Sequence, residues 1–143
     1  MITKEIKCNT AEYTESLRLR SGVLRAPLGK ELSNLDTFGE ESQLHFGCFR
    51  DDQLKGCIVA KPTESKAQFK LRQMAVAASF QNKGAGKRLI LDFELFLKKN
   101  GIKKVELSAR ELAVLFYEKL GYEVVGGFYL EQGIGHIKMQ KII

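Results

Sequence analysis

The first half of the chain begins with one helix-like stretch and continues into short apolar runs. Residues 10–20 have the spacing of an amphipathic helix, and the Thr10 hydroxyl can cap its first turn. The apolar positions that could face inward are Tyr13, Leu17 and Leu24. Residues 25–29 end this helix, because proline cannot continue it and glycine frees the turn. A short helix or an ordered loop is expected over the polar residues 30–43.

Three strand-like runs follow, each bounded by turn residues. They cover residues 44–49, 54–60 and 69–76, with turns at 50–53 and 62–66. Short runs of apolar, β-branched and aromatic residues between polar turns are typical of strands that pair with their neighbours in sequence. The pattern therefore predicts a three-stranded antiparallel meander.

A helix and a further strand complete a crossover after the meander. Between residues 87 and 100, apolar side chains recur with the period of a helix that packs on a sheet. These side chains are Leu89, Ile90, Phe93, Phe96 and Leu97. Gly101 ends the helix, and residues 103–108 form the next expected strand. Because a helix connects them, the strands 69–76 and 103–108 should be parallel.

The C-terminal part of the chain predicts one more helix and three short strands. The helix covers residues 111–120, and Gly121 is its stop. Its apolar face would consist of Leu112, Leu115, Phe116 and Leu120. The strands are expected at 122–125, 127–131 and 136–142. This order predicts an α/β (α+β) fold, with a mixed sheet and helices on both faces, in a single domain over residues 1–143.

Composition narrows the class of protein. The 143 residues are 44% hydrophobic and 28% charged, as in a soluble globular domain. No apolar run approaches the roughly 20 residues of a spanning helix, and no signal-peptide layout is visible, so a cytoplasmic location without a membrane partner is expected. Three cysteines and two histidines without ligand spacing predict no metal site, and Cys48 and Cys57 are expected to be buried free thiols.

The net charge of +6 raises the question of which class of anionic partner the protein binds. Nucleic acid, an anionic membrane surface and a polyanionic small molecule all remain compatible with such a charge. The basic residues are scattered, however, and aromatic residues do not interleave with them as in a single-strand binding face. A phosphorylated cofactor therefore explains the charge more simply than nucleic acid does.

A glycine-rich loop before the 87–100 helix is the candidate phosphate site. Gly84 and Gly86 let the main chain approach a phosphate at the positive end of a helix, and Lys83, Lys87 and Arg88 add charge. A Walker A loop needs four residues between its glycines followed by Lys-Ser/Thr, which is not the order here. A Rossmann loop needs a third glycine where Leu89 stands. The pattern favours a diphosphate cradle of another kind.

Two motifs resemble those of the GNAT superfamily of N-acyltransferases. Met74-Ala-Val76 followed by Gln81-x-x-Gly84-x-Gly86 is similar to its Q/R-x-x-G-x-G/A signature. Ala113-x-x-Phe116-Tyr-Glu-Lys-Leu-Gly-Tyr122 is similar to its second signature. The segment 24–29 also resembles a subgroup of small bacterial GNAT-domain proteins. The resemblance implies a mostly antiparallel central sheet with a V-shaped splay between the fourth and fifth strands, at residues 72–76 and 105–109.

The resemblance also implies roles for individual residues. Those expected to bind the coenzyme are Met74, Ala75, Val76, Gln81, Asn82, Lys83, Gly84, Ala85, Gly86, Lys87 and Arg110. Tyr117 matches the tyrosine that protonates the leaving thiolate in such proteins. Lys70 stands where many relatives carry a glutamate base, so the base remains open between Glu131, His136 and a water chain beginning at Gln73.

The expected function is transfer of an acetyl group from acetyl-CoA to a primary amine by direct attack in a ternary complex. The acceptor would be a small-molecule or peptide amine, and a homodimer is possible. Asp36, Glu40, Glu41 and Glu131 hint at a cationic acceptor, although acidic residues are ordinary on a surface. The alternative is a non-catalytic acyl-CoA-binding regulatory or sensor module of the same fold. A basic nucleic-acid-associated domain is the third reading, motivated by charge alone.

Overall fold

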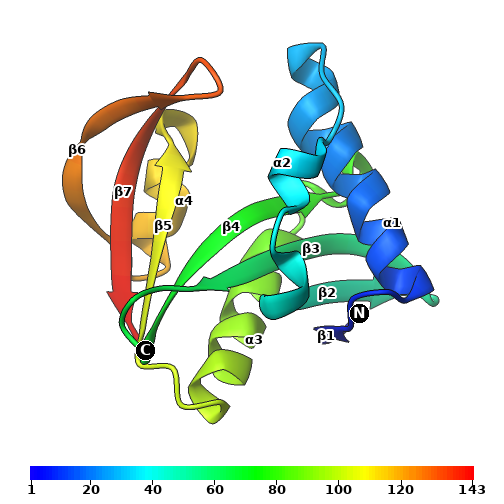
Figure 1. The fold of residues 1–143 in the computed structure, drawn as a ribbon, viewed down its shortest axis with the longest axis horizontal. Coiled ribbons are helices and arrows are strands. Elements are labelled where there is room, and N and C mark those ends of the chain that lie inside the picture. The colour runs from blue at the N-terminus through cyan, green and yellow to red at the C-terminus, as the bar shows by residue number, and fades with distance from the viewer.

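Seven strands form one sheet in the order β1-β2-β3-β4-β5-β7-β6 in the computed structural model, which describes residues 1–143 (Figure 1). The strands are β1 Ile2–Ile6, β2 Leu44–Arg50, β3 Gln53–Pro62, β4 Gln68–Val76, β5 Lys104–Arg110, β6 Glu123–Glu131 and β7 Ile134–Ile142. The helices are α1 Ala11–Arg20, α2 Asn34–Thr37, α3 Ala85–Lys99 and α4 Val114–Lys119. None of the helices combines the length and the apolarity needed to cross a bilayer.

The splay between β4 and β5 is the feature that opens the sheet. Every pair of neighbouring strands is antiparallel except β4 and β5, which are parallel. They pair only at residues 68–70 and 104–106, and beyond this point they diverge, as Figure 1 shows. The predicted mixed, mostly antiparallel sheet and its V-shaped splay are therefore confirmed.

The helices cover both faces of the sheet, as expected. Helix α1 contacts β3 and β4 on one face, and α3 contacts β2 and β3 on the other. The α3 side chains that form the centre of the core are fully buried: Leu89, Ile90, Phe93 and Leu97. Phe93 stacks on Phe46 of β2 with ring centroids 5.0 Å apart. The apolar residues that recur with a helical period in this segment therefore pack into the core.

A bulge in β4 lies at the start of its splayed half. Strand β3 pairs Cys57 with Ala75 and Val59 with Arg72, so two residues of β4 lie opposite one of β3. Gln73, inside the bulge, has a φ of 52°, a left-handed conformation that side chains other than glycine seldom adopt. The bulge interrupts the regular pairing with β3, which resumes at Ala75 and Val76, and Gln73 and Met74 in the bulge line the opening.

Three details of the N-terminal half can be compared with the sequence prediction: one strand was missed, one helix cap is confirmed and one apolar face was wrong. Strand β1 was not predicted, because a five-residue edge strand with two charged residues carries a weak pattern. Thr10 does cap α1, through a hydrogen bond from the Tyr13 amide. The expected apolar stripe on α1 was wrong, however, since the helix buries Ser16 and Arg20 instead. Polar partners on β4 and in the α2–β2 connection make this burial possible.

The C-terminal part also differs from the prediction. The expected helix 111–120 is a 3₁₀ turn at Glu111–Ala113 followed by the six residues of α4. Leu112 and Leu115 are exposed, so the predicted apolar face was wrong, whereas Leu120 is buried. The expected strands 122–125 and 127–131 are one strand, β6, with an irregularity between Val124 and Phe128. Two glycines there let the strand continue through the distortion.

Candidate active site

A cavity of about 470 Å³ occupies the opening between β4 and β5. Its walls come from both faces of the sheet, because the splay leaves a passage between them. The lining residues include Leu24, Arg25, Leu35 and Asp36 before β2; Lys61, Lys70, Arg72, Gln73 and Met74 on β3 and β4; Ser108, Arg110 and Tyr117 on β5 and α4; and Glu131, Gln132 and His136 on the β6–β7 hairpin. The cavity therefore gathers Met74, Arg110, Tyr117, Glu131 and His136, which the sequence singled out separately.

The glycine loop lies at the end of β4, where α3 begins. Gly84 is the residue before the helix and has a φ of 82°, which glycine adopts without strain. No side chain caps this helix, and the amides of Ala85, Gly86 and Lys87 have no hydrogen-bond partner in the protein. Lys83 and Lys87 are exposed and form no ion pair. The arrangement leaves donors and positive charge free for an anion.

The main chain at the end of β4 has one edge free. Ala77 donates its N–H to Lys55 of β3 at 2.8 Å, so the peptide groups of Val76, one residue earlier, point away from β3. The Gln81 side chain donates to the Val76 carbonyl oxygen at 2.9 Å, which agrees with this direction. Gln81 therefore ties the loop to the strand. The Val76 N–H faces the side from which β5 has separated.

Tyr117 enters the cavity from α4. Its ring packs edge-on against Phe116 and Tyr122, with centroids 5.1 and 5.6 Å away. Its hydroxyl forms no hydrogen bond with the protein, and the protein contains no fully buried polar side-chain atom without a partner. The hydroxyl is therefore reachable from the cavity. Burial of the ring raises the pKa of Tyr117 to about 12, so the hydroxyl keeps its proton at neutral pH.

His136 and Glu131 face each other across the β6–β7 hairpin. The His136 side chain is buried, and its Nδ1 lies 2.8 Å from the Ile134 carbonyl oxygen. A carbonyl oxygen can only accept, so Nδ1 carries a proton, and Nε2 holds the lone pair of the neutral ring. Nε2 is 3.6 Å from a carboxylate oxygen of Glu131, which is half-exposed. Nε2 of His136 can therefore take up a proton, and the Glu131 carboxylate can compensate the positive charge that results.

Three further polar residues lie near this pair: Tyr129 on β6, and Ser108 and Arg110 on β5. Tyr129 stacks near His136 with ring centroids 6.0 Å apart, and its hydroxyl hydrogen-bonds to Ser108. Arg110 is the register partner of His136 on the neighbouring strand. The side chain of Arg110 forms no ion pair or hydrogen bond. The sequence had singled out Arg110 but neither Ser108 nor Tyr129, whose contact depends on pairing between distant strands.

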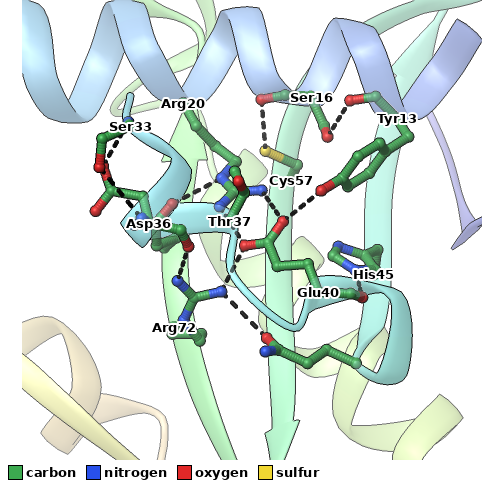
Figure 2. Close-up of polar contacts among 12 residues, drawn as sticks. Tyr13, Ser16, Arg20, Ser33, Asp36, Thr37, Glu40, His45, Cys57 and Arg72 are labelled. Atoms are coloured by element: carbon green, nitrogen blue, oxygen red, sulfur yellow. Dashed lines mark hydrogen bonds and ion pairs between the residues drawn. The ribbon is translucent and has the colours of Figure 1, made fainter. Parts of the chain in front are cut away.

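A buried ionic cluster supports the β4 bulge from the α1 face (Figure 2). Arg20 donates to both oxygens of Glu40, and Arg72 donates to Glu40 at 2.6 Å. Arg20 also donates through Nε to the Gln73 side chain at 2.7 Å. Arg20 and Glu40 are fully buried. Their contacts fix three parts of the chain to one another: α1, the residues before β2, and β4. This cluster holds the bulge in place.

The cluster also explains the charge states around it. Burial alone would raise the pKa of Glu40, but hydrogen bonds from Arg20, Tyr13 and Arg72 outweigh it and lower the pKa to about 2. Burial and the hydrogen bond to Glu40 raise the pKa of Tyr13. Glu40 is therefore a fixed structural anion. The sequence had named Glu40 only as a hint of a cationic acceptor and had not singled out Arg20, because no local pattern distinguishes a buried arginine from an exposed one on a helix.

Two of the four acidic residues that hinted at a cationic acceptor, Asp36 and Glu40, are engaged with arginines. Asp36 binds Arg25 at 2.9 Å, and the Arg25 hydrogen bond lowers the pKa of Asp36 to about 2 despite burial. Glu40 is enclosed by Arg20 and Arg72. Only Glu131 among the cavity-lining acids lacks an arginine or lysine partner. The cavity wall is therefore not acidic.

Comparison with known proteins places the chain in a family. The model of the acetyltransferase (GNAT) domain matches residues 26–143. The N-acetyltransferase YitI of Bacillus subtilis, described as uncharacterized, is 31% identical over 146 residues, which cover 97% of this chain and 96% of that protein.

Two solved structures share the fold. The acyl-CoA N-acyltransferase from Pseudomonas aeruginosa superposes with a TM-score of 0.83 at 20% identity, over 98% of both chains. An aminoglycoside 6′-N-acetyltransferase complexed with coenzyme A superposes with a TM-score of 0.78 at 22% identity, over 99% of this chain and 97% of that one. On the family match and the identity to YitI, this chain belongs to the GNAT family of acyl-CoA-dependent N-acetyltransferases.

Proposed function

We propose that this protein transfers an acetyl group from acetyl-CoA to a primary amine by direct attack within a ternary complex. The observation that carries the proposal is the cavity in the splay, which is lined by both Tyr117 and His136 together with Met74 of β4. A proton donor and a proton acceptor then flank one site, as acyl transfer to an amine requires.

The residues at the end of β4 suit coenzyme A. The free amides of Ala85, Gly86 and Lys87 offer hydrogen bonds to a pyrophosphate, and Lys83 and Lys87 offer charge. The free edge of β4 offers hydrogen bonds to the amide groups of an extended pantetheine arm, by the same geometry that adds a strand to a sheet. The fold neighbour complexed with coenzyme A supports this assignment by analogy.

Acetyl-CoA, when bound, supplies a thioester whose carbonyl carbon accepts the amine. The main-chain N–H groups of residues 74–76 are the candidates to stabilise negative charge on the carbonyl oxygen, and that of Val76 points away from β3. The carbon–nitrogen bond forms as the carbon–sulfur bond breaks. Tyr117 gives its proton to the departing thiolate, because its raised pKa keeps it protonated at neutral pH.

The amine must lose a proton during the reaction, and His136 is the base that the geometry favours. Its Nδ1 proton is held by the Ile134 carbonyl, which leaves the Nε2 lone pair available. Glu131, 3.6 Å from Nε2, would stabilise the imidazolium formed by proton uptake. Lys70, at the position of the glutamate base of many relatives, lines the same cavity and is unsuited to this role.

A thiol-release assay with acetyl-CoA and a broad panel of amines tests the proposal. We expect turnover with at least one amine, and loss of most of this turnover in both Tyr117→Phe and His136→Gln. Retained coenzyme binding in both variants would show that the loss is catalytic. If the wild-type protein binds coenzyme A tightly and transfers acetyl to no amine, the chain acts as a coenzyme-binding module and the proposal is wrong.

A further inference from the structure

Two lysines lie directly opposite each other where β3 and β4 border the cavity. Lys61 of β3 and Lys70 of β4 are register partners, and both line the cavity. Neither side chain forms an ion pair or hydrogen bond. Like charges facing each other across a strand pair are destabilising in the absence of an anion. The pair is therefore an unused concentration of positive charge.

Other groups near the lysines do not neutralise them. Glu106, the register partner of Lys70 on β5, is bound instead by Lys138 at 3.0 Å and by the Gln68 amide. The cavity acid Asp36 is bound by Arg25. Arg110, on the opposite wall, is also without a partner. Lys61 and Lys70 on one wall and Arg110 on the other are therefore unpaired cations, and Glu131 is the one cavity-lining acid without an arginine or lysine partner.

The lysine pair is too far from the glycine loop to serve the coenzyme phosphates. Lys70 and Val76 are six positions apart on β4, or roughly 20 Å at the usual rise of a strand. The phosphate loop begins five residues beyond Val76, in the same direction along the chain. Met74 and Tyr117 border the cavity between these two ends. A ligand held by the lysines would therefore approach the reaction site from the side away from the loop.

We propose that Lys61 and Lys70 bind the carboxylate or phosphate of the acceptor, so that the substrate is a primary amine bearing a separate anionic group. This inference rests on the proposed transfer reaction and specifies its acceptor. The amine reaches Met74 and His136, while the anionic group stays several ångströms away on the lysines. This acceptor differs from the cationic one hinted at by the sequence, and two of the four acids behind that hint, Asp36 and Glu40, are paired with arginines.

Matched acceptors test the charge preference. The thiol-release assay would compare 4-aminobutyrate with its carboxamide, phosphoethanolamine with ethanolamine, and both pairs with 1,5-diaminopentane. We expect kcat/KM about tenfold higher for each anionic member, the effect of one or two charge-assisted hydrogen bonds. The carboxylate and phosphate arms show which anion is preferred. Equal rates within both pairs, or preference for the diamine, would overturn the proposal.

Variants locate the preference on the lysines. Lys61→Ala and Lys70→Ala should raise the KM of the anionic acceptor about tenfold and leave the KM of acetyl-CoA and the rate with the neutral acceptor nearly unchanged. Lys70→Glu should favour the diamine. The exposed Lys98 of α3 provides the control, and Lys98→Ala should change none of these values. An equal loss with all acceptors would assign the lysines a structural role only.

Calorimetric titration of glutarate and of inorganic phosphate into the protein with coenzyme A separates this inference from the transfer reaction. If no amine is acetylated but glutarate or phosphate binds and Lys70→Ala abolishes that binding, the transfer proposal fails and the anion site stands. If amines are acetylated but neither anion binds and anionic acceptors are not preferred, the anion site is wrong and the transfer proposal stands.

Discussion

The guanidinium of Arg20 and the carboxylate of Glu40 form a two-point hydrogen-bonded pair that is closed to solvent (Figure 2). Arg20 also holds Gln73 in the β4 bulge. The pair thus connects the helix on one face with the strand that borders the active site. A buried charge that loses its partner is costly, so the pair is expected to matter for stability more than any surface ion pair.

Arg20→Met should destabilise the protein by about 3–5 kcal/mol, because it leaves Glu40 with only part of its hydrogen bonds. Urea denaturation at neutral pH measures this change. Arg18→Met is the matched control: Arg18 is exposed and pairs only with the exposed Glu15 on the same helix. Comparable losses in the two variants would contradict the assigned role of the cluster.

The same cluster predicts a stability loss in acid. The pKa of Glu40 is about 2 in the folded protein against an ordinary value of 4.5, so the folded state binds this proton less readily than the unfolded state. Its stabilisation is therefore fully present above pH 4.5 and is lost as the pH falls towards 2, on the order of 3 kcal/mol in total. Denaturation midpoints between pH 6 and 2.5 check this, and Glu40→Gln should have a flatter profile. An unchanged slope would contradict it.

The conformation of Gly84 makes a prediction for coenzyme binding. At a φ of 82° an added Cβ meets no neighbour but strains the backbone by about 1–2 kcal/mol, which shifts the loop amides. Gly84→Ala should weaken coenzyme A binding about tenfold by calorimetry. Gly101→Ala has the same type of strain, with a φ of 83° and open space, but lies at the far end of α3. It should bind coenzyme A normally; equal weakening would show a general loss of stability instead.

Tyr117 makes a prediction about both rate and pH. Tyr117→Phe should lower kcat about 10²–10³-fold and leave the KM of acetyl-CoA within about threefold, because the phenol acts only as a proton donor. Its pKa of about 12 means that the acid form persists in alkali, so no activity loss from this group is expected until the pH approaches 12. Initial rates between pH 6 and 10.5 check the second point. A decrease in kcat that Tyr117→Phe removes, with a midpoint below pH 10, would contradict it.

The sequence predicted mainly the features that depend on residues close together in the chain, and it did not predict most of those that depend on contacts between distant residues. The glycine loop, α3 and the meander follow from residue spacing, and all are present with nearly the expected limits. The parallel pairing of β4 with β5 followed from the crossover helix. The apolar stripe predicted on α1 was wrong, because this helix buries Arg20, and that burial depends on Glu40, 20 residues away. The predicted burial of Leu112 and Leu115 was wrong, because the 3₁₀ turn rotates the face that a continuous helix would have buried.

The candidate site was predicted in pieces. Tyr117 and the loop came from motif resemblance, and the structure then places Tyr117 with His136 and Glu131 around one cavity. The lysine pair could not be found from sequence, because Lys61 and Lys70 become neighbours only through the register of β3 and β4. The sign of the cavity charge likewise required knowledge of which acids are already paired with arginines.

The most direct test of the account is the fate of the acetyl group, followed by mass spectrometry of both the amine and the intact protein. Acetyl-CoA alone should leave the wild-type protein without an acetyl adduct. Addition of an accepted amine should give one acetylated amine per thiol released, and Tyr117→Phe should slow both together. An acetylated protein that then passes its acetyl group to the amine, or thiol release without acetylated amine, would contradict direct transfer in the β4–β5 cavity.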